Sequence, residues 1–195
     1  DALNPGEALT FALWIYAPSP GSDRKFGGKA VSNTGYALGH IQNKLYPEVW
    51  DAVGTRYTFQ SGFIPANNWT HVAMTWQTNG YLIGYINGIE VNRIPTGAYP
   101  IASNDNPFIL GRAPWASQFL FNGRLDEAYV FNRVLSQKEI LSLAAGGYVA
   151  DCGVAGQTLT CTMPALDADQ SVIVNTVAVP LQLGLFAYDA VVSQE

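Results

Sequence analysis

The stretch FNGRLDEAYVFNRVLSQKEI, residues Phe121–Ile140, decides the fold because it combines one strand with one short helix. Leu125, Tyr129 and Phe131 mark an apolar strand. The residues that follow have the signature of a helix start. The stretch therefore predicts a strand that runs into a helix near the end of a chain that is otherwise rich in strand patterns.

A capping box, Ser136-x-x-Glu139, begins the predicted helix. In such a box each of the two side chains satisfies an unpaired amide at the helix start. Leu135, before the cap, can pack onto Ile140 as a hydrophobic staple. Two glycines at 146–147 end the helix after barely two turns. We assign Ser136 and Glu139 a structural role.

Composition limits the class of protein. The chain has 195 residues, of which 13% are charged and 12% aromatic, with 19 Gly and 11 Pro, a balance that favours strands and turns. The net charge is −5 and Lys and Arg do not cluster, so we expect neither nucleic acid nor an anionic membrane as a partner. No apolar run approaches the roughly 20 residues of a membrane span. The first residues lack the basic and then apolar segments of a signal peptide, so we expect a mature or excised fragment.

Short apolar runs between turn residues predict an all-β meander. The first strand, Ala8–Ala17, is apolar on both faces, which indicates a strand covered on both sides. Asn79-Gly80 and Asn87-Gly88 join three later strands into a ribbon, and Asn79-Gly80 predicts a type I′ turn. Further strands are predicted at Gly28–Ser32, Tyr36–Ile41, Lys44–Trp50, Arg56–Ser61, Trp69–Gln77, Tyr81–Ile86, Ile89–Ile94 and Phe108–Gly111, with loops at Ser22–Lys25, Gly97–Pro107 and Ala113–Ser117.

Four motifs, together with the opening stretch, resemble laminin-G-like jelly rolls of the concanavalin A type. In order, the motifs are LTFALWI at 9–15, WTHVAMTW at 69–76, YING at 85–88 and FILGR at 108–112, and with the opening stretch they cover about residues 8–146. The resemblance implies an all-β antiparallel jelly-roll sandwich with one short helix over residues 1–147, followed by a β appendage over 148–195. It also implies no cofactor and an extracellular or cell-surface protein that binds glycans or proteins.

The appendage is predicted to contain strands at Tyr148–Val154, Gln157–Met163 and Ser171–Val179, and resembles the final hairpin of immunoglobulin-like repeats on bacterial surface proteins. Cys152 and Cys161 are the only cysteines. Direct pairing of the two across a hairpin leaves Ala155–Thr158 as the loop. A disulfide and two spare thiols are both possible, and the secretion that the resemblance implies favours the disulfide. Such a bridge would stabilise the appendage by about 2–3 kcal/mol.

Domains of the resembled family usually begin with a strand or two ahead of the one that holds Trp14, whereas only seven residues precede Ala8 here. We therefore expect one sheet to lack an edge strand. Leu181–Tyr188 is apolar and strand-like, with Pro180 as its hinge. It could complete its own jelly roll or add to another copy. This gives the second functional hypothesis, a structural subunit of an extracellular fibre or surface array assembled by strand donation.

A glycanase, the third hypothesis, needs two carboxylates placed on one strand face. None of three carboxylate pairs in the sequence has the spacing or the place in a strand that this requires, and we interpret them as surface groups. The pairs are Glu48 with Asp51, Asp126 with Glu127, and Asp167 with Asp169. His40 and His71 lack a nearby nucleophile and have no metal-ligand spacing, so we interpret them as histidines satisfied locally.

Asp126 differs from the other carboxylates because jelly rolls of this family usually carry an acid at that place. We expect it to accept hydrogen bonds from the backbone or from Arg124 and Arg112, in a structural role. Calcium is a further possibility that the resemblance suggests. Asn104-Asp105-Asn106 and Asp51 offer oxygen ligands. We prefer the alternative that these residues form ordinary turns.

Glycan binding usually needs an exposed aromatic ring that stacks on a sugar, with polar groups beside it. Trp115 is the first candidate because it lies in a predicted loop. Trp50, Tyr46 and Tyr57 on neighbouring strands could line the same or another concave face, whereas Trp14 and Trp76 are assigned to the core. The leading hypothesis is thus a non-catalytic extracellular recognition module that binds glycans or proteins through its loops.

Overall fold

The computed structural model describes residues 3–18, 23–116, 119–146, 151–155 and 158–162, the last two ranges by their backbone alone. The chain divides into two compact units, Asp1–Ala144 and Ala145–Glu195. Among the residues described, the first unit holds strands β1 to β10 and the helix, and the second holds one hairpin. The reading of these units as two domains stays a prediction.

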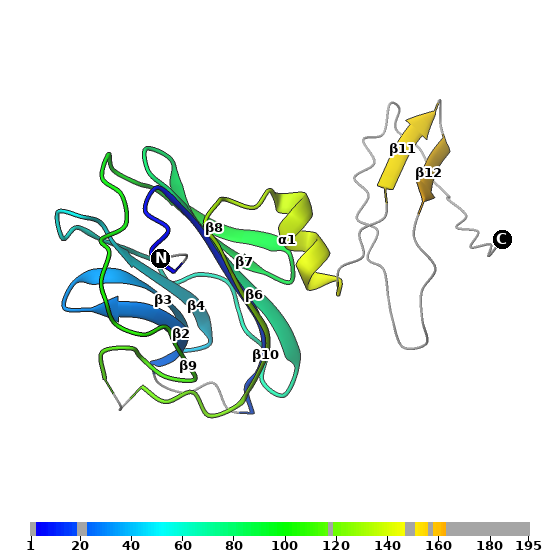
Figure 1. Ribbon diagram of the computed structural model, residues 1–195. Helices are drawn as coiled ribbons and strands as arrows, with labels where there is room; N and C mark the ends of the chain where they lie inside the picture. Colours follow the sequence, from blue (N-terminus) through cyan, green and yellow to red (C-terminus); the bar gives the residue numbers. More distant parts are fainter. Residues whose placement is uncertain (1–2, 19–22, 117–118, 147–150, 156–157, 163–195) are drawn as a thin grey trace. The chain divides into compact units, whose positions relative to one another are not determined.

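Two antiparallel sheets of five strands form the first unit (Figure 1). The first sheet has the order β10 (Arg124–Phe131), β1 (Ala8–Tyr16), β6 (Trp69–Gln77), β7 (Tyr81–Ile86) and β8 (Ile89–Pro95). The second sheet has the order β5 (Arg56–Thr58), β4 (Lys44–Trp50), β3 (Thr34–Ile41), β2 (Arg24–Val31) and β9 (Ile109–Leu110). The predicted all-β jelly-roll sandwich is confirmed.

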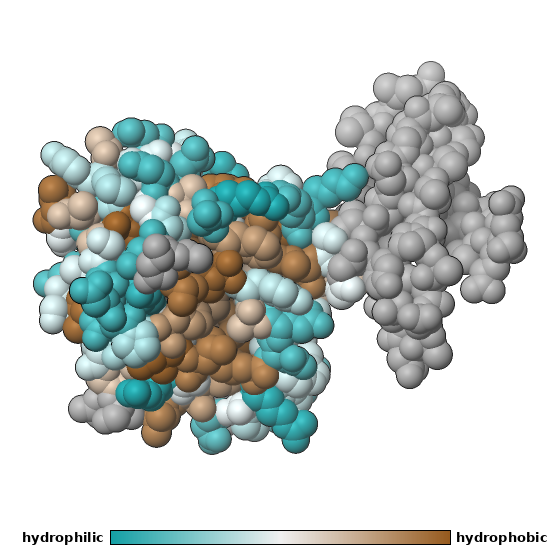
Figure 2. Space-filling view, viewed as in Figure 1, coloured by the Kyte–Doolittle hydropathy of each residue, from teal (hydrophilic) through white to brown (hydrophobic). Residues whose placement is uncertain are grey.

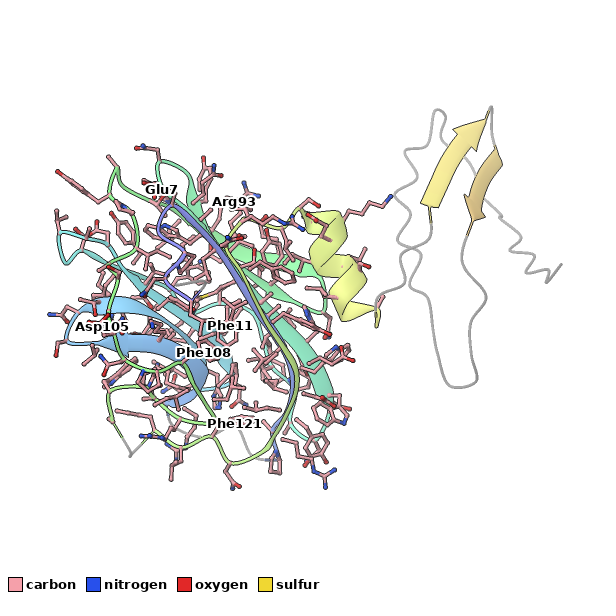
Figure 3. The ribbon with its side chains drawn as sticks, in the orientation of Figure 1. Glu7, Phe11, Arg93, Asp105, Phe108 and Phe121 are labelled. Carbon is pink, nitrogen blue, oxygen red and sulfur yellow. The ribbon has the colours of Figure 1, made fainter. Side chains whose placement is uncertain are left out.

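The core lies between the sheets and is built by alternate residues of each strand, because successive side chains of a strand point to opposite faces. Strand β1 contributes Leu9, Phe11, Leu13 and Ile15, and Phe11 is seen between the sheets in Figure 3. Other strands add Phe26, Tyr36, Leu38, Leu45, Val49, Val72, Met74, Trp76 and Leu82. Fully buried side chains from both sheets thus form one continuous core.

Trp14 is the exception among the predicted core residues. It follows Leu13 in β1, so the strand alternation turns it to the outer face of the first sheet, where it is half-buried. Its ring packs edge-to-face on His71, with the ring centroids 5.6 Å apart. The assignment of Trp14 to the core was wrong because a strand that is apolar on both faces does not reveal which face is inner. Trp76, by contrast, is fully buried.

Helix α1 (Gln137–Ala144) covers part of the outer face of the first sheet. The amide of Ser136 donates to Oε2 of Glu139 at 2.8 Å, and the amide of Glu139 donates to Oγ of Ser136 at 3.3 Å, which is the reciprocal geometry of a capping box. Leu135 and Ile140 pack on the sheet together with Ala12, Ala73 and Tyr85. The helix therefore begins where the local sequence predicts.

A buried threonine of the first sheet fixes the chain just before the helix. The Thr10 hydroxyl accepts a hydrogen bond from the amide of Leu135 at 2.9 Å and donates one to the carbonyl of Arg133 at 2.7 Å. Both partners lie more than a hundred residues along the chain from Thr10. The docking of the helix thus depends on β1 as well as on its own cap.

Several predicted boundaries need correction. Strand β2 begins at Arg24, so the surface loop predicted over Ser22–Lys25 is wrong at Lys25, which is buried in that strand. Strand β5 ends at Thr58, three residues before the predicted Ser61. At the turn after β6, Asn79 has a φ of 55° but Gly80 has no positive φ, so this hairpin is not closed by a type I′ turn.

The second unit contains the hairpin of β11 (Asp151–Ala155) and β12 (Thr158–Thr162). Cys152 lies directly opposite Cys161, which is the predicted register. Ala155 also pairs with Thr158, so the predicted four-residue loop is wrong at both of its ends. The disulfide stays a prediction. The predicted strands Ser171–Val179 and Leu181–Tyr188, and the pair Asp167 and Asp169, lie outside the described residues.

Candidate ligand-binding face

Strand β4 presents Tyr46, Glu48 and Trp50 on the outer face of the second sheet. The residues that alternate with them point to the other face, where Leu45 and Val49 belong to the core. On the neighbouring strand β3, the partners of these three residues are all small: Gly39, Ala37 and Gly35. All three small residues are buried, and the Lys25 side chain lies over Gly39.

The loop after β9 brings Trp115 to the same face. Its ring meets that of Trp50 edge-to-face, with centroids 5.8 Å apart and an interplanar angle of 80°. Trp115 is 37% exposed whereas Trp50 is 8% exposed, so the inner ring supports the outer one. Such an edge-to-face pair is worth about 0.5–1.5 kcal/mol beyond the area that it buries. The structure thus brings these two candidate rings together, although they are distant in the chain.

A buried lysine lies beneath the aromatic rings. The Lys25 Nζ atom lies 2.8 Å from Oδ1 of Asp23 and 2.8 Å from Oε2 of Glu48. It also lies 4.2 Å from the ring centroid of Tyr46 and 5.9 Å from that of Trp115. The ammonium group is thus held by two carboxylates and two ring faces, which compensate the loss of water around a buried charge.

Arg56 on β5 completes the charge network. Its guanidinium forms an ion pair with Glu48, donates to the hydroxyl of Tyr46, and lies 5.5 Å from the ring centroid of Trp50. Partial burial opposes its charge, but the hydrogen bond and the charge of Glu48 outweigh that effect, so the pKa of Arg56 is raised. The side chain is 45% exposed. It therefore presents charged donors beside Trp50.

Glu48 departs from its predicted role, because it is buried rather than a surface group. Its carboxylate is neutralised from both sides by Lys25 and Arg56. A glycanase needs two carboxylates that flank the scissile bond, one able to act as an acid and one as a base or nucleophile. Glu48 and Asp23 instead share the ammonium of Lys25. This arrangement suits a rigid binding surface better than acid–base chemistry.

Tyr57 does not join this face. It pairs with Val49 and therefore points to the inner side of the second sheet. Its ring packs edge-to-face on Trp76 with centroids 4.9 Å apart, and its hydroxyl lies 3.3 Å from Oδ2 of Asp51. Of the four aromatic candidates, the structure brings together Tyr46, Trp50 and Trp115.

Asp51, a candidate calcium ligand, closes the turn between β4 and β5. Its Oδ1 atom accepts hydrogen bonds from the amides of Val53 at 3.1 Å and Thr55 at 2.8 Å. With Tyr57 on the other oxygen, both carboxylate oxygens already have partners. These contacts favour the turn-forming interpretation over a calcium site.

The other calcium candidates behave in the same way. Oδ1 of Asn104 accepts from the amide of Asn106 at 3.0 Å, and Nδ2 of Asn104 donates to the carbonyl of Lys29 at 3.3 Å. Asp105 is exposed. Among the residues with described side chains, no group of three or more His, Cys, Asp or Glu residues could hold a metal ion.

Asp126 lies at a bulge of β10, not at the face just described. Its Oδ1 atom accepts from the amide of Glu127 at 2.9 Å, and Glu127 has a φ of 46°. The guanidinium of Arg124 lies over the ring of Tyr16, 5.6 Å from its centroid. The bulge leaves both Asp126 and Glu127 exposed, so simple alternation does not describe this pair.

Lys25 and Arg56 are the residues of this face that sequence reasoning did not identify. Lys25 follows Asp23 and Arg24, and such a charged run is typical of a surface loop. Its burial depends on Glu48, a residue of β4 that is two strands away in the sheet. Only the strand order shows that these residues meet.

Comparison with known proteins agrees with the fold. A family model of the concanavalin A-like lectin/glucanases superfamily, of the laminin G type, matches residues 1–141. The chain therefore belongs to this superfamily. The comparison with curated proteins gave no match.

Solved structures with a similar fold are receptor-binding and lectin-like domains. One, from a study of botulinum neurotoxin type C whose cell entry depends on two ganglioside molecules, has a TM-score of 0.53 and 18% identity and covers 72% of this chain and 36% of its own. The binding domain of Paraclostridial Mosquitocidal Protein 1 has a TM-score of 0.53 and 18% identity, covering 72% and 37%. The heptameric SAP-like pentraxin of Limulus polyphemus has a TM-score of 0.52 and 15% identity, covering 71% of each.

These likenesses show the fold alone, since the identities are low. The chain spans little more than a third of the length of the toxin binding domains. Within the described residues, no helix is long and apolar enough to cross a membrane.

Proposed function

We propose that this chain is a non-catalytic recognition module of a surface or secreted protein, and that it binds glycans on the outer face of the second sheet. The observation that carries the proposal is the exposed ring of Trp115, which rests on Trp50, while the guanidinium of Arg56 lies 5.5 Å from the ring centroid of the same Trp50. A sugar ring has an apolar face that stacks on an indole, and hydroxyl groups that need donors and acceptors. Arg56 offers the donors and Asp23 a carboxylate.

Rigidity supports a binding role. The Arg56 side chain is held in place by Glu48 and Tyr46. Lys25 forms an ion pair with the same Glu48 carboxylate and so holds it in place as well. Side chains that are already ordered lose little conformational entropy when a ligand binds, so more of the contact energy appears as affinity. Extracellular placement belongs to the same proposal. It is supported by the similarity to a laminin G-type family and to toxin binding domains.

The non-catalytic part of the proposal is supported by the burial of Glu48 and by its two cationic partners. A hydrolysis assay on a panel of polysaccharides tests it. We expect no product above a buffer control. Product formation that disappears in the Glu48→Gln variant would instead identify a glycanase.

The binding part is tested with a glycan array in calcium-containing buffer, using wild type, Trp115→Ala and Trp69→Ala. Trp69 is a matched control because it is 43% exposed and lies on the first sheet. We expect wild type and Trp69→Ala to bind the same glycans, and Trp115→Ala to lose at least about tenfold in affinity, or about 1.4 kcal/mol. No binding by wild type, or equal binding by Trp115→Ala, would contradict the proposal.

A further inference from the structure

Arg56 uses a single guanidinium nitrogen for its hydrogen bonds. Nη2 donates both to the hydroxyl of Tyr46 and to Oε1 of Glu48. Within the part of the chain whose side chains are described, Nε and Nη1 make no hydrogen bond, and the side chain is 45% exposed. A guanidinium has five N–H donors and cannot accept a hydrogen bond. Arg56 is therefore a cation held in place with donors that remain for a ligand.

The carboxylates of this face, by contrast, are already engaged. Oε1 of Glu48 pairs with Arg56 and Oε2 with Lys25, and the Glu48 side chain is almost completely buried. Oδ1 of Asp23 pairs with the same Lys25 ammonium. The face thus offers a ligand more hydrogen-bond donors than acceptors. Its complement is a ligand rich in acceptors, and an ionised carboxylate is a group that only accepts.

Positive charge also prevails on this face. Lys44 is exposed and belongs to the outer row of β4 that holds Tyr46, because Leu45 between them faces the core. The cations of the outer face then outnumber its carboxylates, with Lys25, Lys44 and Arg56 against Glu48 and Asp23. The whole chain, however, has a net charge of −5. A local excess of the opposite sign favours the approach of an anionic group to this face.

The apolar side of the sandwich offers no such partners. Figure 2 shows a brown, hydrophobic area at the centre of the side in view, where Figure 3 labels Phe108 and Phe121. Both rings pack on the core. An apolar surface can bury part of a ligand, but it gives charged and hydroxyl groups no hydrogen-bond partner. The outer face of the second sheet is thus the better place for a charged ligand.

We propose that Arg56 makes this face selective for acidic glycans, in which a sugar ring carries a carboxylate. The inference rests on the proposed function, because the sugar stacks on Trp115. The ring of Trp115 and the guanidinium of Arg56 both contact Trp50, at 5.8 Å and 5.5 Å from its ring centroid, so one short oligosaccharide reaches both. The carboxylate accepts hydrogen bonds from the unused donors of Arg56. Such charge-assisted bonds are roughly twice as strong as those between neutral groups.

A glycan array with matched pairs tests the inference on the full chain. Uronic and sialic acids both carry the carboxylate, so the pairs are trigalacturonic acid with its methyl ester and 3′-sialyllactose with its methyl ester. We expect wild type to bind the acid of one pair at least about tenfold more tightly than the ester, and the responding pair identifies the source of the carboxylate. Equal binding of acid and ester that is lost in Trp115→Ala would overturn this inference and leave the proposed function intact. No binding to any of the four would overturn both.

Arg56→Gln tests the residue itself, because it removes the cation and keeps a polar side chain. We expect the ratio of acid affinity to ester affinity to fall to about one. Arg93→Gln is the matched control. Arg93 is 50% exposed, pairs with Glu90 and lies 5.2 Å from the ring centroid of Tyr81, but it belongs to the first sheet. It should keep the wild-type ratio. An unchanged ratio in Arg56→Gln, or an equal fall in Arg93→Gln, would overturn the assignment.

The salt dependence of wild-type binding gives a readout that needs no variant. Salt screens the attraction between exposed charges, with a Debye length of about 10 Å at 0.1 M and about 3 Å at 1 M. Between these NaCl concentrations we expect the affinity for the responding acid to fall at least about threefold more than the affinity for its ester. An equal response of acid and ester to salt would contradict a contact between the carboxylate and Arg56.

Discussion

Removal of the charge of Glu48 is the sharpest perturbation of the candidate ligand-binding face. Glu48→Gln keeps the shape of the side chain but leaves Lys25 and Arg56 without their common carboxylate. Lys25 is almost completely buried, so water cannot replace the lost partner. Arg56 is 45% exposed and can regain water. The loss therefore falls mainly on Lys25.

The magnitude follows from these environments. Breaking a buried ion pair by removing one partner costs about 3–5 kcal/mol, because an uncompensated charge remains. Lys25 keeps Asp23 as a partner at 2.8 Å, so the free energy of unfolding is expected to fall by about 3 kcal/mol. For a chain of this size the melting temperature should fall by roughly 2–4 °C per kcal/mol. Replacing both members, with Lys25→Met and Glu48→Leu, should recover most of the loss, since no buried charge then remains.

Urea unfolding followed by tryptophan fluorescence is the assay. All five tryptophans lie within residues 14–115, so the signal reports the first unit alone. Glu90→Gln is the matched control because its ion pair with Arg93 is more exposed to water and should contribute little to stability. If Glu48→Gln destabilised the fold no more than Glu90→Gln, the reasoning about the buried network would be refuted.

Three further predictions concern the rest of the first unit. Thr10→Val should cost about 1–3 kcal/mol in urea unfolding, because it leaves a buried amide before the helix without an acceptor; a loss under about 0.5 kcal/mol would contradict this. Burial lowers the pKa of His40 and His71 from 6.5 to about 4, so the unfolded chain binds protons first as the pH falls. The contribution of the two histidines to the free energy of unfolding should be constant above about pH 6.5. Between pH 6.5 and pH 4 it should fall by up to about 1.4 kcal/mol per pH unit for each histidine, and the slope should be shallower in His71→Gln. A free energy of unfolding that does not change over this pH range would contradict the prediction. Gly88→Ala should destabilise more than Gly54→Ala in thermal unfolding. Both glycines have positive φ, but a Cβ at Gly88 would lie 2.6 Å from a side chain of helix α1, whereas a Cβ at Gly54 would meet nothing within 4 Å. Equal losses of thermal stability in the two variants would argue against the close contact at Gly88.

Local sequence signals predicted the strands and the helix because they report interactions between near neighbours, whereas the resemblance to laminin-G-like domains predicted the jelly roll. The capping box of Ser136 and Glu139 involves residues three apart, and its hydrogen bonds are present. The apolar residues of β6 and the turn at Asn87-Gly88, with φ values of 49° and 79°, are equally local. Such signals fixed the number and order of most strands.

The candidate ligand-binding face was only partly predictable because it depends on contacts between distant strands. Trp115 and Trp50 were grouped by residue type, and they do meet. The burial of Lys25 follows from the pairing of three strands, which no local pattern contains. Tyr57 was assigned to the wrong face because β5 has only three residues, so the face to which each side chain points is set by its pairing partner. The partner of Tyr57 is Val49, which faces the core.

Nuclear magnetic resonance of the five tryptophan indole N–H groups tests the central claim most directly. The glycan that the array identifies is titrated into the full-length protein. The account predicts that the signals of Trp115 and Trp50 shift with a common affinity, while those of Trp69 and the buried Trp76 stay in place. Shifts confined to Trp69 and Trp14, on the opposite sheet, would contradict it.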